Sequence, residues 1–406
     1  MTGRRDQTTA QIRASAIAEF SEVGPRAFSL QSVAKRGYAS VGSVYERWAN
    51  SDACISDLVA TELPSRVDDV IVAWTTPDHS LDALVLRDLT GALSLADLRF
   101  IVECAFAARD RPDLRSFVSG EIERLGHAIA ARINLPGIEP TVAWWTASTW
   151  LGHALLVTSG CPVPPEFAPE VAQLIATISH RDDSAAIAPT VTPPVNVPLP
   201  HPTPMAGQDK TAEALIQSAA DVIVTQGVDQ ADTRSIAEGA GLTTGAIYRR
   251  YAGRGEVLDD VLRAELTPER YAWVRDFAAA LTSDDGLIDG ARYLAGLVAR
   301  TWTDERSAQL LLEITVAAHT ESAVRAGVMR EITKVADART DLLAPFAEEG
   351  LIRSDLSAST LAWLLQVPPV GMRILASIGM TPTEDELTEL MATYLAFLLP
   401  DNTTSV

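Results

Sequence analysis

The sequence predicts an all-α protein made of two similar halves. Apolar residues recur at three- and four-residue spacing in both halves, as at Leu81, Leu84 and Val85 and again at Leu310 and Ile314. This spacing is typical of helices with one buried face, and no alternating run that would predict a strand occurs. A chain of 406 residues is also long for a single domain, so two or three domains are expected.

An internal repeat with an offset of 203 residues organises the chain. The stretch SLQSVAKRGYASVGSVYERW at 29–48 aligns without a gap with DTRSIAEGAGLTTGAIYRRY at 232–251. Weaker matches follow in the same order, such as Glu103 with Glu313 and Trp144 with Trp363, at offsets that grow as loops lengthen. Matches in a common order predict two copies of one unit fused head to tail.

Residues 232–251 read as two short helices joined by a tight turn, a helix-turn-helix. Asp232 is placed to cap the first helix and Thr243 the second, because each can accept hydrogen bonds from backbone N–H groups. Gly241 falls at the turn, where a positive φ costs glycine little. The apolar positions expected to join the two helices are Ile236, Ala237 and Ile247.

The first copy departs from this pattern in two places. Tyr38 stands where the second copy has Gly241, and a tyrosine with positive φ is strained. We expect Gly37 to absorb the turn instead. Glu46 replaces an outward polar or basic residue and would repel phosphate, so the first copy is expected to bind DNA weakly or to read a different half-site.

The stretch GLTTGAIYRRYAGRGEVL resembles the DNA-binding domain of TetR-family repressors, through Gly245, Ile247, Tyr248 and Tyr251. The resemblance implies that each half has an N-terminal three-helix domain with the helix-turn-helix, followed by a helical-bundle effector domain. It also implies an intramolecular pseudo-dimer of two TetR-like units. The alternative is an ordinary helical hairpin within an all-α core.

The repeat and the linker between its copies set the expected boundaries. Residues 188–209 hold seven prolines, which deny helices and sheets their backbone donors. In polyproline geometry such a segment spans on the order of 60 Å. The expected domains are 1–55 (first helix-turn-helix), 56–187 (first effector domain), 188–209 (linker), 210–258 (second helix-turn-helix) and 259–402 (second effector domain).

The resemblance implies that the second helix of each motif enters the major groove. Phosphate contacts would position it and contacts to base edges would select sequence. Arg4 and Arg5 are a candidate basic arm, and packing in the domain core is the alternative role for the two motif tyrosines. The candidate DNA-contacting residues are Gln31, Ser40, Val41, Ser43, Tyr45 and Arg47 in the first copy, and Arg234, Thr243, Thr244, Ala246, Tyr248, Arg249, Arg250 and Arg254 in the second.

The family also pairs its subunits through the last two long helices and binds an effector inside each bundle. We expect the pairing helices to meet within one chain through Trp144, Trp145, Leu151, Leu155, Trp363, Leu364, Ile374 and Leu375, unless these residues pack within their own bundles. The candidate pocket residues are Trp74, Phe100, Phe106, Trp150, Trp273, Tyr293 and Trp302, for which a plain core role is the alternative. The implied effector is small and apolar.

The net charge of −20 argues against a generally basic nucleic-acid binder. However, residues 241–254 hold three arginines, and acidic residues concentrate elsewhere. Three cysteines without a CxxC motif, and an N-terminus without an apolar run, lead us to expect a cytoplasmic protein that does not enter membranes. Phosphate-binding, nucleophile-elbow, dinucleotide and zinc-protease motifs are missing from the sequence, so we expect no enzyme, metal or cofactor.

Two functions remain. The first is a ligand-responsive repressor of a double-stranded DNA operator, whose two unlike heads predict an asymmetric operator. A single chain in solution is one expectation for it, with further dimerisation left open. The second is a small-molecule- or partner-binding protein with a degenerate first head.

Overall fold

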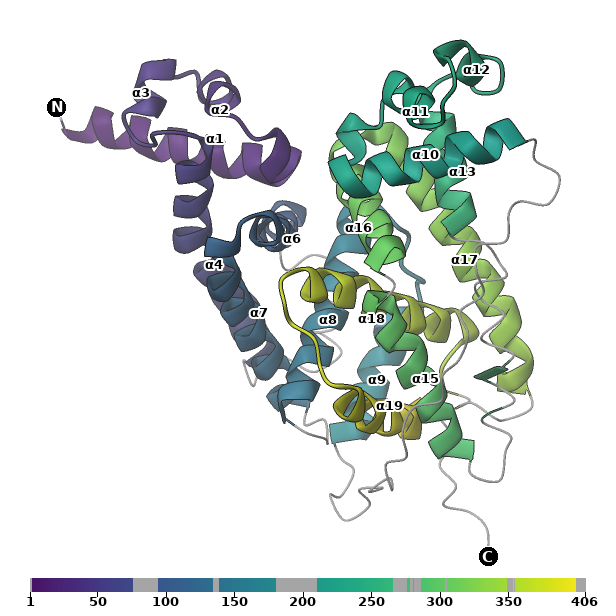
Figure 1. Cartoon of the computed structure of the whole chain (residues 1–406). Coiled ribbons are helices and arrows are strands. Elements are labelled where there is room, and N and C mark those ends of the chain that lie inside the picture. The colour runs from purple at the N-terminus through teal and green to yellow at the C-terminus, as the bar shows by residue number, and fades with distance from the viewer. Residues whose placement is uncertain are drawn as a thin grey trace, which may run out of the picture.

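The structure is a computed structural model, and it describes residues 2–75, 94–133, 139–179, 210–265, 276–277, 280, 286–303, 305–348, 353 and 355–398. These residues form helices joined by turns and contain no strand, which confirms the all-α fold for them (Figure 1). None of the described helices combines the length and apolar composition needed to cross a bilayer. The proline-rich segment 188–209 lies outside the described residues.

The first half carries a three-helix head on a helical body. Helix α1 loses helical geometry at Gly24, whose φ is 70°, and the short helices α2 and α3 pack beside it. Helix α4 leads from the head into the body and packs on α7. The helices of this half are α1 (Thr2–Ala27), α2 (Leu30–Arg36), α3 (Val41–Tyr45), α4 (Ser51–Thr75), α6 (Leu95–Asp110), α7 (Pro112–Ile133), α8 (Glu139–Thr158) and α9 (Phe167–Ser179).

The second half follows the same order of elements. Gly227, with φ 89°, ends the first helix of its head, as Gly24 interrupts α1. Helix α13 then leads into the body and packs on α17. The elements are α10 (Lys210–Gln226), the 3-10 turn η2 (Val228–Gln230), α11 (Thr233–Gly239), α12 (Thr244–Tyr248), α13 (Arg254–Glu265), α15 (Gly286–Thr303), α16 (Glu305–Thr320), α17 (Ser322–Glu348), α18 (Ala358–Ser377) and α19 (Glu384–Leu398).

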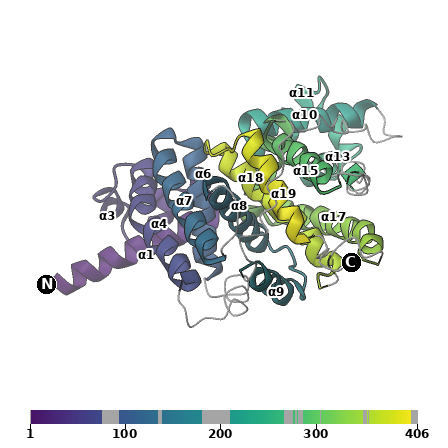
Figure 2. The same ribbon diagram turned by 90° about the horizontal axis from the view of Figure 1, so that it is seen from below.

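The two halves meet through α8 and α18, which pack along each other at the centre of the molecule (Figure 2). Helix α8 also contacts α19, and α18 contacts α9. At the crossing, a Cβ atom built on Gly152 would overlap the carbonyl oxygen of Val367, and one built on Gly371 would overlap that of Ser148. The two backbones therefore approach too closely for any side chain at either glycine.

Tryptophans from both halves flank this crossing. The Trp144 indole N–H donates to the carbonyl of Met380 over 3.0 Å, and Trp145 lies 4.8 Å from Tyr394 between ring centroids. From the second half toward the first, the Trp363 indole N–H donates to Nδ1 of His153 over 3.3 Å. Each of the three tryptophans thus contacts the other half, as well as packing in its own.

Prolines stand inside two helices without ending them. Helix α4 continues through Pro64 and α18 continues through Pro368 and Pro369. A proline inside a helix costs about 3 kcal/mol or more. Both helices are long and bury one face or more against the body, so tertiary packing outweighs this local cost.

Candidate nucleic-acid interface

The second head has the local geometry of a helix-turn-helix. Asp232 accepts a hydrogen bond of 2.7 Å from the Ser235 amide and so caps α11, as expected. The backbone and side-chain hydrogen bonds from Ser235 lower the pKa of Asp232. Gly241 takes φ 67° at the turn, and Ile236, Ala237 and Ile247 are buried between the helices, which confirms the expected frame.

The outward face of α12 is exposed as the motif predicts. Thr243 occupies the N-cap position, although its side chain makes no capping hydrogen bond. Thr244, Arg249 and Arg250 are exposed, and Tyr248 is 61% exposed. This exposure rules out the alternative in which Tyr248 packs in the domain core. Figure 1 shows α12 at the outer end of its head, away from the bundle where the halves meet.

The first head has a matching surface. Ser40 caps α3 by accepting from the Ser43 amide over 3.1 Å, and Ser29 caps α2 in the same way. Gln31 and Ser40 are exposed, Ser43 is half-buried, and Val41 and Tyr45 are 46% and 48% exposed. The Arg47 guanidinium donates to the Ser43 carbonyl and to the Thr9 hydroxyl, so α1 steadies its position. The side chains of Arg4 and Arg5 lie outside the described residues.

Three expectations about these heads are wrong. Ala246 is only 5% exposed, because it and Ile247 face inward together from a helix of five residues. Ala246 therefore presents no side chain to a base edge. Gly37 does not absorb the first turn: its φ is −82°, and Tyr38 takes the positive φ of 50°.

The third wrong expectation concerns Arg254, which is turned into the protein. Its guanidinium donates to the carbonyls of Ala231 and Val228 and forms an ion pair of 2.8 Å with Glu321, just before α17. The side chain is thus committed to holding η2 and α17 together. Arg234, in contrast, is highly exposed and pairs with Glu238 on the same helix face.

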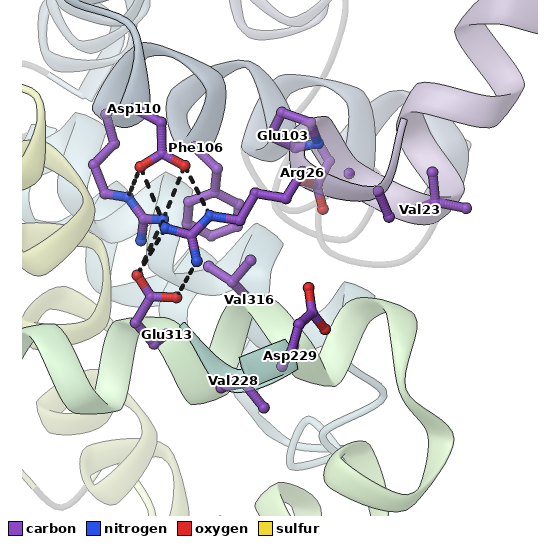
Figure 3. A pocket seen from close by; sticks show the side chains of 14 residues that line it. Val23, Arg26, Glu103, Phe106, Asp110, Val228, Asp229, Glu313 and Val316 are labelled. Carbon is purple, nitrogen blue, oxygen red and sulfur yellow. Dashed lines mark hydrogen bonds and ion pairs between the residues drawn. The ribbon is translucent and has the colours of Figure 1, made fainter. Parts of the chain in front are cut away.

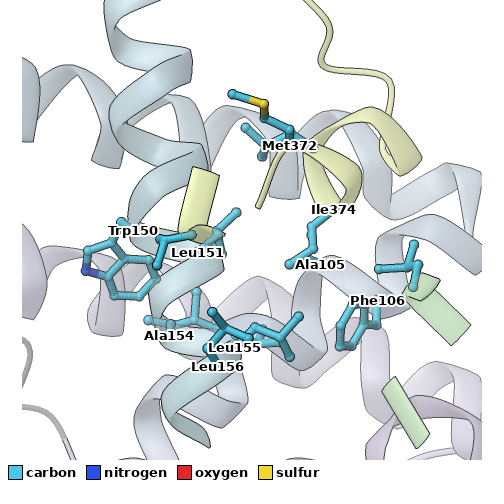
Figure 4. Packing of buried hydrophobic residues seen from close by; sticks show 14 of the residues in the cluster. Ala105, Phe106, Trp150, Leu151, Ala154, Leu155, Leu156, Met372 and Ile374 are labelled. Carbon is cyan, nitrogen blue, oxygen red and sulfur yellow. The ribbon is translucent and has the colours of Figure 1, made fainter. Parts of the chain in front are cut away.

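The candidate pocket residues that the structure describes are buried side chains of the two bodies. Trp74, Phe100 and Trp150 are buried in the first body, where Phe100 packs edge-on against Phe20 and beneath the Arg66 guanidinium. Figure 4 shows Trp150 in this apolar packing near Leu151 and Ala154. Tyr293 packs near Phe277 in the second body. Trp273 and the side chain of Trp302 lie outside the described residues.

Phe106 alone of the described candidates lines the small cavity of about 50 Å³ between α1, α6, η2 and α16. Charged side chains line the cavity alongside apolar ones (Figure 3). Arg26 reaches across from the first half and pairs with Glu313 over 2.5 Å, while Arg109 pairs with the same carboxylate over 3.2 Å. A cavity of this size and polarity does not suit the apolar effector that the family resemblance implies.

Sequence reasoning did not identify this ion-pair cluster. In the sequence, Glu103 and Glu313 served only as a matching pair of the internal repeat. In the structure each carboxylate lies on an otherwise apolar helix face and is almost fully buried. Because a buried carboxylate requires partners, a glutamate in an apolar helical stretch is the sequence feature that could have predicted a cluster of paired charges. Its partners could not be named, since Arg26 is 287 residues away. Within the described part of the chain, no group of three metal-ligating side chains comes together.

Comparison with known proteins places a family domain in the second head. Residues 215–261 match the model for bacterial regulatory proteins of the tetR family. Over 63 residues the chain is 40% identical to the HTH-type transcriptional regulator SrpR of Pseudomonas putida, covering 16% of this chain and 30% of that protein. Over 59 residues it is 41% identical to the uncharacterized HTH-type transcriptional regulator TtgW, also of Pseudomonas putida, covering 14% and 44%. The chain thus spans less than half the length of these curated relatives.

Among solved structures, a putative TetR-family transcriptional regulator from Rhodococcus sp. is 20% identical, covers 47% of this chain and all of its own, and has a TM-score of 0.38. The fatty acid degradation regulator FadR from Bacillus halodurans is 15% identical, covers 49% and 99%, and has a TM-score of 0.37. Over residues 215–261 the chain is thus similar to bacterial regulatory proteins of the tetR family.

Proposed function

We propose that the chain is a ligand-responsive, DNA-binding transcriptional regulator that carries two DNA-reading heads on one polypeptide. The family match at 215–261 covers most of the second head, residues 210–258, and α12 presents Thr244, Tyr248 and Arg249 outward from that head. This exposed face on a helix-turn-helix frame is the observation that carries the proposal. Arginine and tyrosine side chains at such a surface bind phosphate, and small polar side chains reach base edges.

The first head, residues 1–55, is proposed as the partner head. It repeats the second in its capped helices, its turn with a positive φ and its exposed tyrosine. In the proposed arrangement, Gln31, Ser40, Val41, Ser43, Tyr45 and Arg47 face the first half-site, and Arg234, Thr243, Thr244, Tyr248, Arg249 and Arg250 face the second.

We further propose that packing of α8 on α18 replaces the subunit contact of a dimer. The reciprocal contacts support this view: α8 meets α19 while α18 meets α9, as an interface between two equivalent surfaces requires. Glu170 of α9 accepts a further hydrogen bond from the hydroxyl of Ser357, the N-cap of α18. Two unlike heads on one such frame would read an asymmetric operator as a single chain.

Release from the operator by a small apolar effector is the proposed mode of regulation. Such an effector would have to open a space among the aromatic side chains buried in the first body, such as Phe100 and Trp150, which pack against their neighbours in this structure. Binding would act by favouring one separation of the heads over another. We propose that the regulator acts as a repressor.

The test replaces Arg249 and Arg250 together by alanine. DNA would first be selected from genomic fragments with the unaltered chain, and binding then measured by mobility shift. Loss of two phosphate contacts should weaken binding and reduce the steepness of its salt dependence by about two units. Arg124→Ala, an exposed arginine of the first body, is the matched control and should bind normally.

The second candidate function is a small-molecule- or partner-binding protein with a degenerate first head. It rests on Glu46, which stands where the second head has Arg249, and on the acidic net charge. Unchanged binding by the double alanine variant, or selection that returns no DNA, would favour this candidate over the regulator.

A further inference from the structure

The turns of the two heads close with the same hydrogen bonds. In the second head, the Gly241 amide donates to the Glu238 carbonyl over 3.0 Å, and the Leu242 amide donates to the Ala237 carbonyl over 2.8 Å. This pair of bonds is a Schellman motif, which requires a left-handed backbone at the residue after the C-cap. Glycine meets that requirement without a Cβ clash.

In the first head the left-handed residue is Tyr38. Its amide donates to the Lys35 carbonyl over 3.4 Å, the next amide donates to Ala34 over 3.0 Å, and its φ is 50°. Tyr38 is the one residue other than glycine with positive φ in the described part of the chain. A side chain in this conformation brings its Cβ close to the neighbouring carbonyl, so the turn is strained.

Within the described fold, the side chain of Tyr38 makes no contact that offsets this strain. The Tyr38 side chain is 95% exposed, and among the described residues no hydrogen bond, ion pair or ring contact holds it. Gly37 stands next to it with an ordinary φ of −82°, and a Cβ built on Gly37 would approach the Ser15 hydroxyl to 3.0 Å. Strained backbone conformations cluster at functional sites.

Tyr38 borders the surface proposed to face DNA. Ser40, two residues later, caps α3, and the next exposed apolar side chains are Val41 and Tyr45. Three exposed apolar or aromatic side chains thus lie within eight residues. At the corresponding positions the second head has Gly241, Thr244 and Tyr248, so the aromatic turn residue is specific to the first head.

We propose that Tyr38 is a DNA-contacting residue of the first head, with its ring against the sugar–phosphate backbone of the first half-site and its hydroxyl donating to a phosphate oxygen. This inference rests on the proposed function. It accounts for Glu46, because a neutral phenol contact at the turn replaces the cationic contact that Arg249 supplies in the second head. A neutral donor releases no counterion, so the contact adds affinity without adding to the salt dependence.

The experiment compares Tyr38→Gly, Tyr38→Asn and Tyr38→Phe with the unaltered chain on the duplex that the unaltered chain selects from a random library. Glycine and asparagine both tolerate a left-handed backbone, so these variants should unfold at an equal or higher urea concentration. Both should bind about tenfold more weakly, as expected for a lost hydrogen bond to a charged group, with an unchanged salt slope. Tyr38→Phe keeps the ring and should bind with intermediate affinity.

Hydroxyl-radical footprinting assigns the contact to a half-site. Tyr38→Gly should lose protection at one half-site, and the Arg249→Ala, Arg250→Ala chain should lose it at the other. If Tyr38→Gly and Tyr38→Asn bind as the parent does, or lose the same half-site as the arginine variant, the inference is overturned while the proposed function stands. If the unaltered chain selects no duplex, the proposed function fails, and the inference fails with it.

Discussion

Asp110 illustrates how single residues hold the two halves together. It accepts hydrogen bonds of 2.9 Å from Nε of Arg26 and from Nε of Arg109, and both arginines also pair with Glu313 of the other half. Burial by itself would raise the pKa of Asp110, but the hydrogen bonds from Arg109 and Arg26 outweigh burial and lower it. The ionised carboxylate is therefore the form that the fold stabilises.

Asp110→Asn should lower the free energy of unfolding at pH 7 by about 1 kcal/mol, since the pair is partly exposed to solvent. A lowered pKa in the folded state means that the contribution is present above the unfolded pKa of about 3.9 and is lost as the pH falls through the folded value. In urea unfolding at several pH values, the difference between the two chains should thus begin to shrink near pH 4 and vanish only below the lowered pKa of the folded state. Asp69→Asn, exposed on α4, is the control, and an equal loss there would contradict the assignment.

The three cysteines illustrate a purely structural role at this scale. Cys54, Cys104 and Cys161 are all buried and form no disulfide. Burial raises the pKa of Cys54 and of Cys161 to about 12 and that of Cys104 well above its ordinary value. Buried thiols with raised pKa values are unreactive. They behave here as small apolar side chains of the core.

At the scale of helices, each half ties its head to its body by an ion pair of opposite polarity. Arg254 at the start of α13 pairs with Glu321 before α17. In the first half Asp52 near the start of α4 pairs with Arg111 before α7. The two ion pairs therefore occupy equivalent places in the two halves, with the positive and negative residues exchanged. The attraction is preserved although the residues differ.

Arg254→Ala should destabilise the second head by about 1–3 kcal/mol, because two backbone carbonyls and Glu321 lose their donor. Arg249→Ala should leave stability unchanged, because that side chain is exposed on the outer face of the head. Urea unfolding of both variants measures the contrast. Equal midpoints for the two chains would show that the Arg254 contacts contribute nothing.

For the whole molecule, the critical contact is the crossing of α8 and α18. Gly152 and Gly371 each lie against the backbone of the opposite helix, so a methyl group at either position forces the helices apart. The tryptophans that flank the crossing fit this separation and would lose contact across it. The relative placement of the two heads depends on this crossing, on the contacts of α8 with α19 and of α18 with α9, and on the ion pairs around Glu313.

Gly371→Ala should lower the free energy of unfolding by about 1–3 kcal/mol or more through overpacking. Gly120→Ala is the matched control, because a Cβ there meets nothing within 4 Å and alanine favours a helix by about 1 kcal/mol. Thermal unfolding should therefore move in opposite directions for the two variants. A Gly371→Ala chain as stable as the parent would mean that the helices slide apart without cost.

The sequence by itself determined the all-α class, the helix-turn-helix of the second head, the Asp232 cap and the turn at Gly241. Such features depend on residues within a few positions of one another, so a short stretch suffices to predict them. It did not determine the inward side of Ala246, the partners of Arg254 or the turn at Tyr38. Those features depend on which side chains the folded protein buries and on which backbone and side-chain groups are within hydrogen-bonding distance.

The ion pairs between Arg26 and Glu313 and the contact of Gly152 with Gly371 were likewise decided only by the tertiary structure. Each joins side chains or backbones more than 200 residues apart. Spacing along the chain carries no information about such partners, because only the packing of the two halves brings them within contact distance.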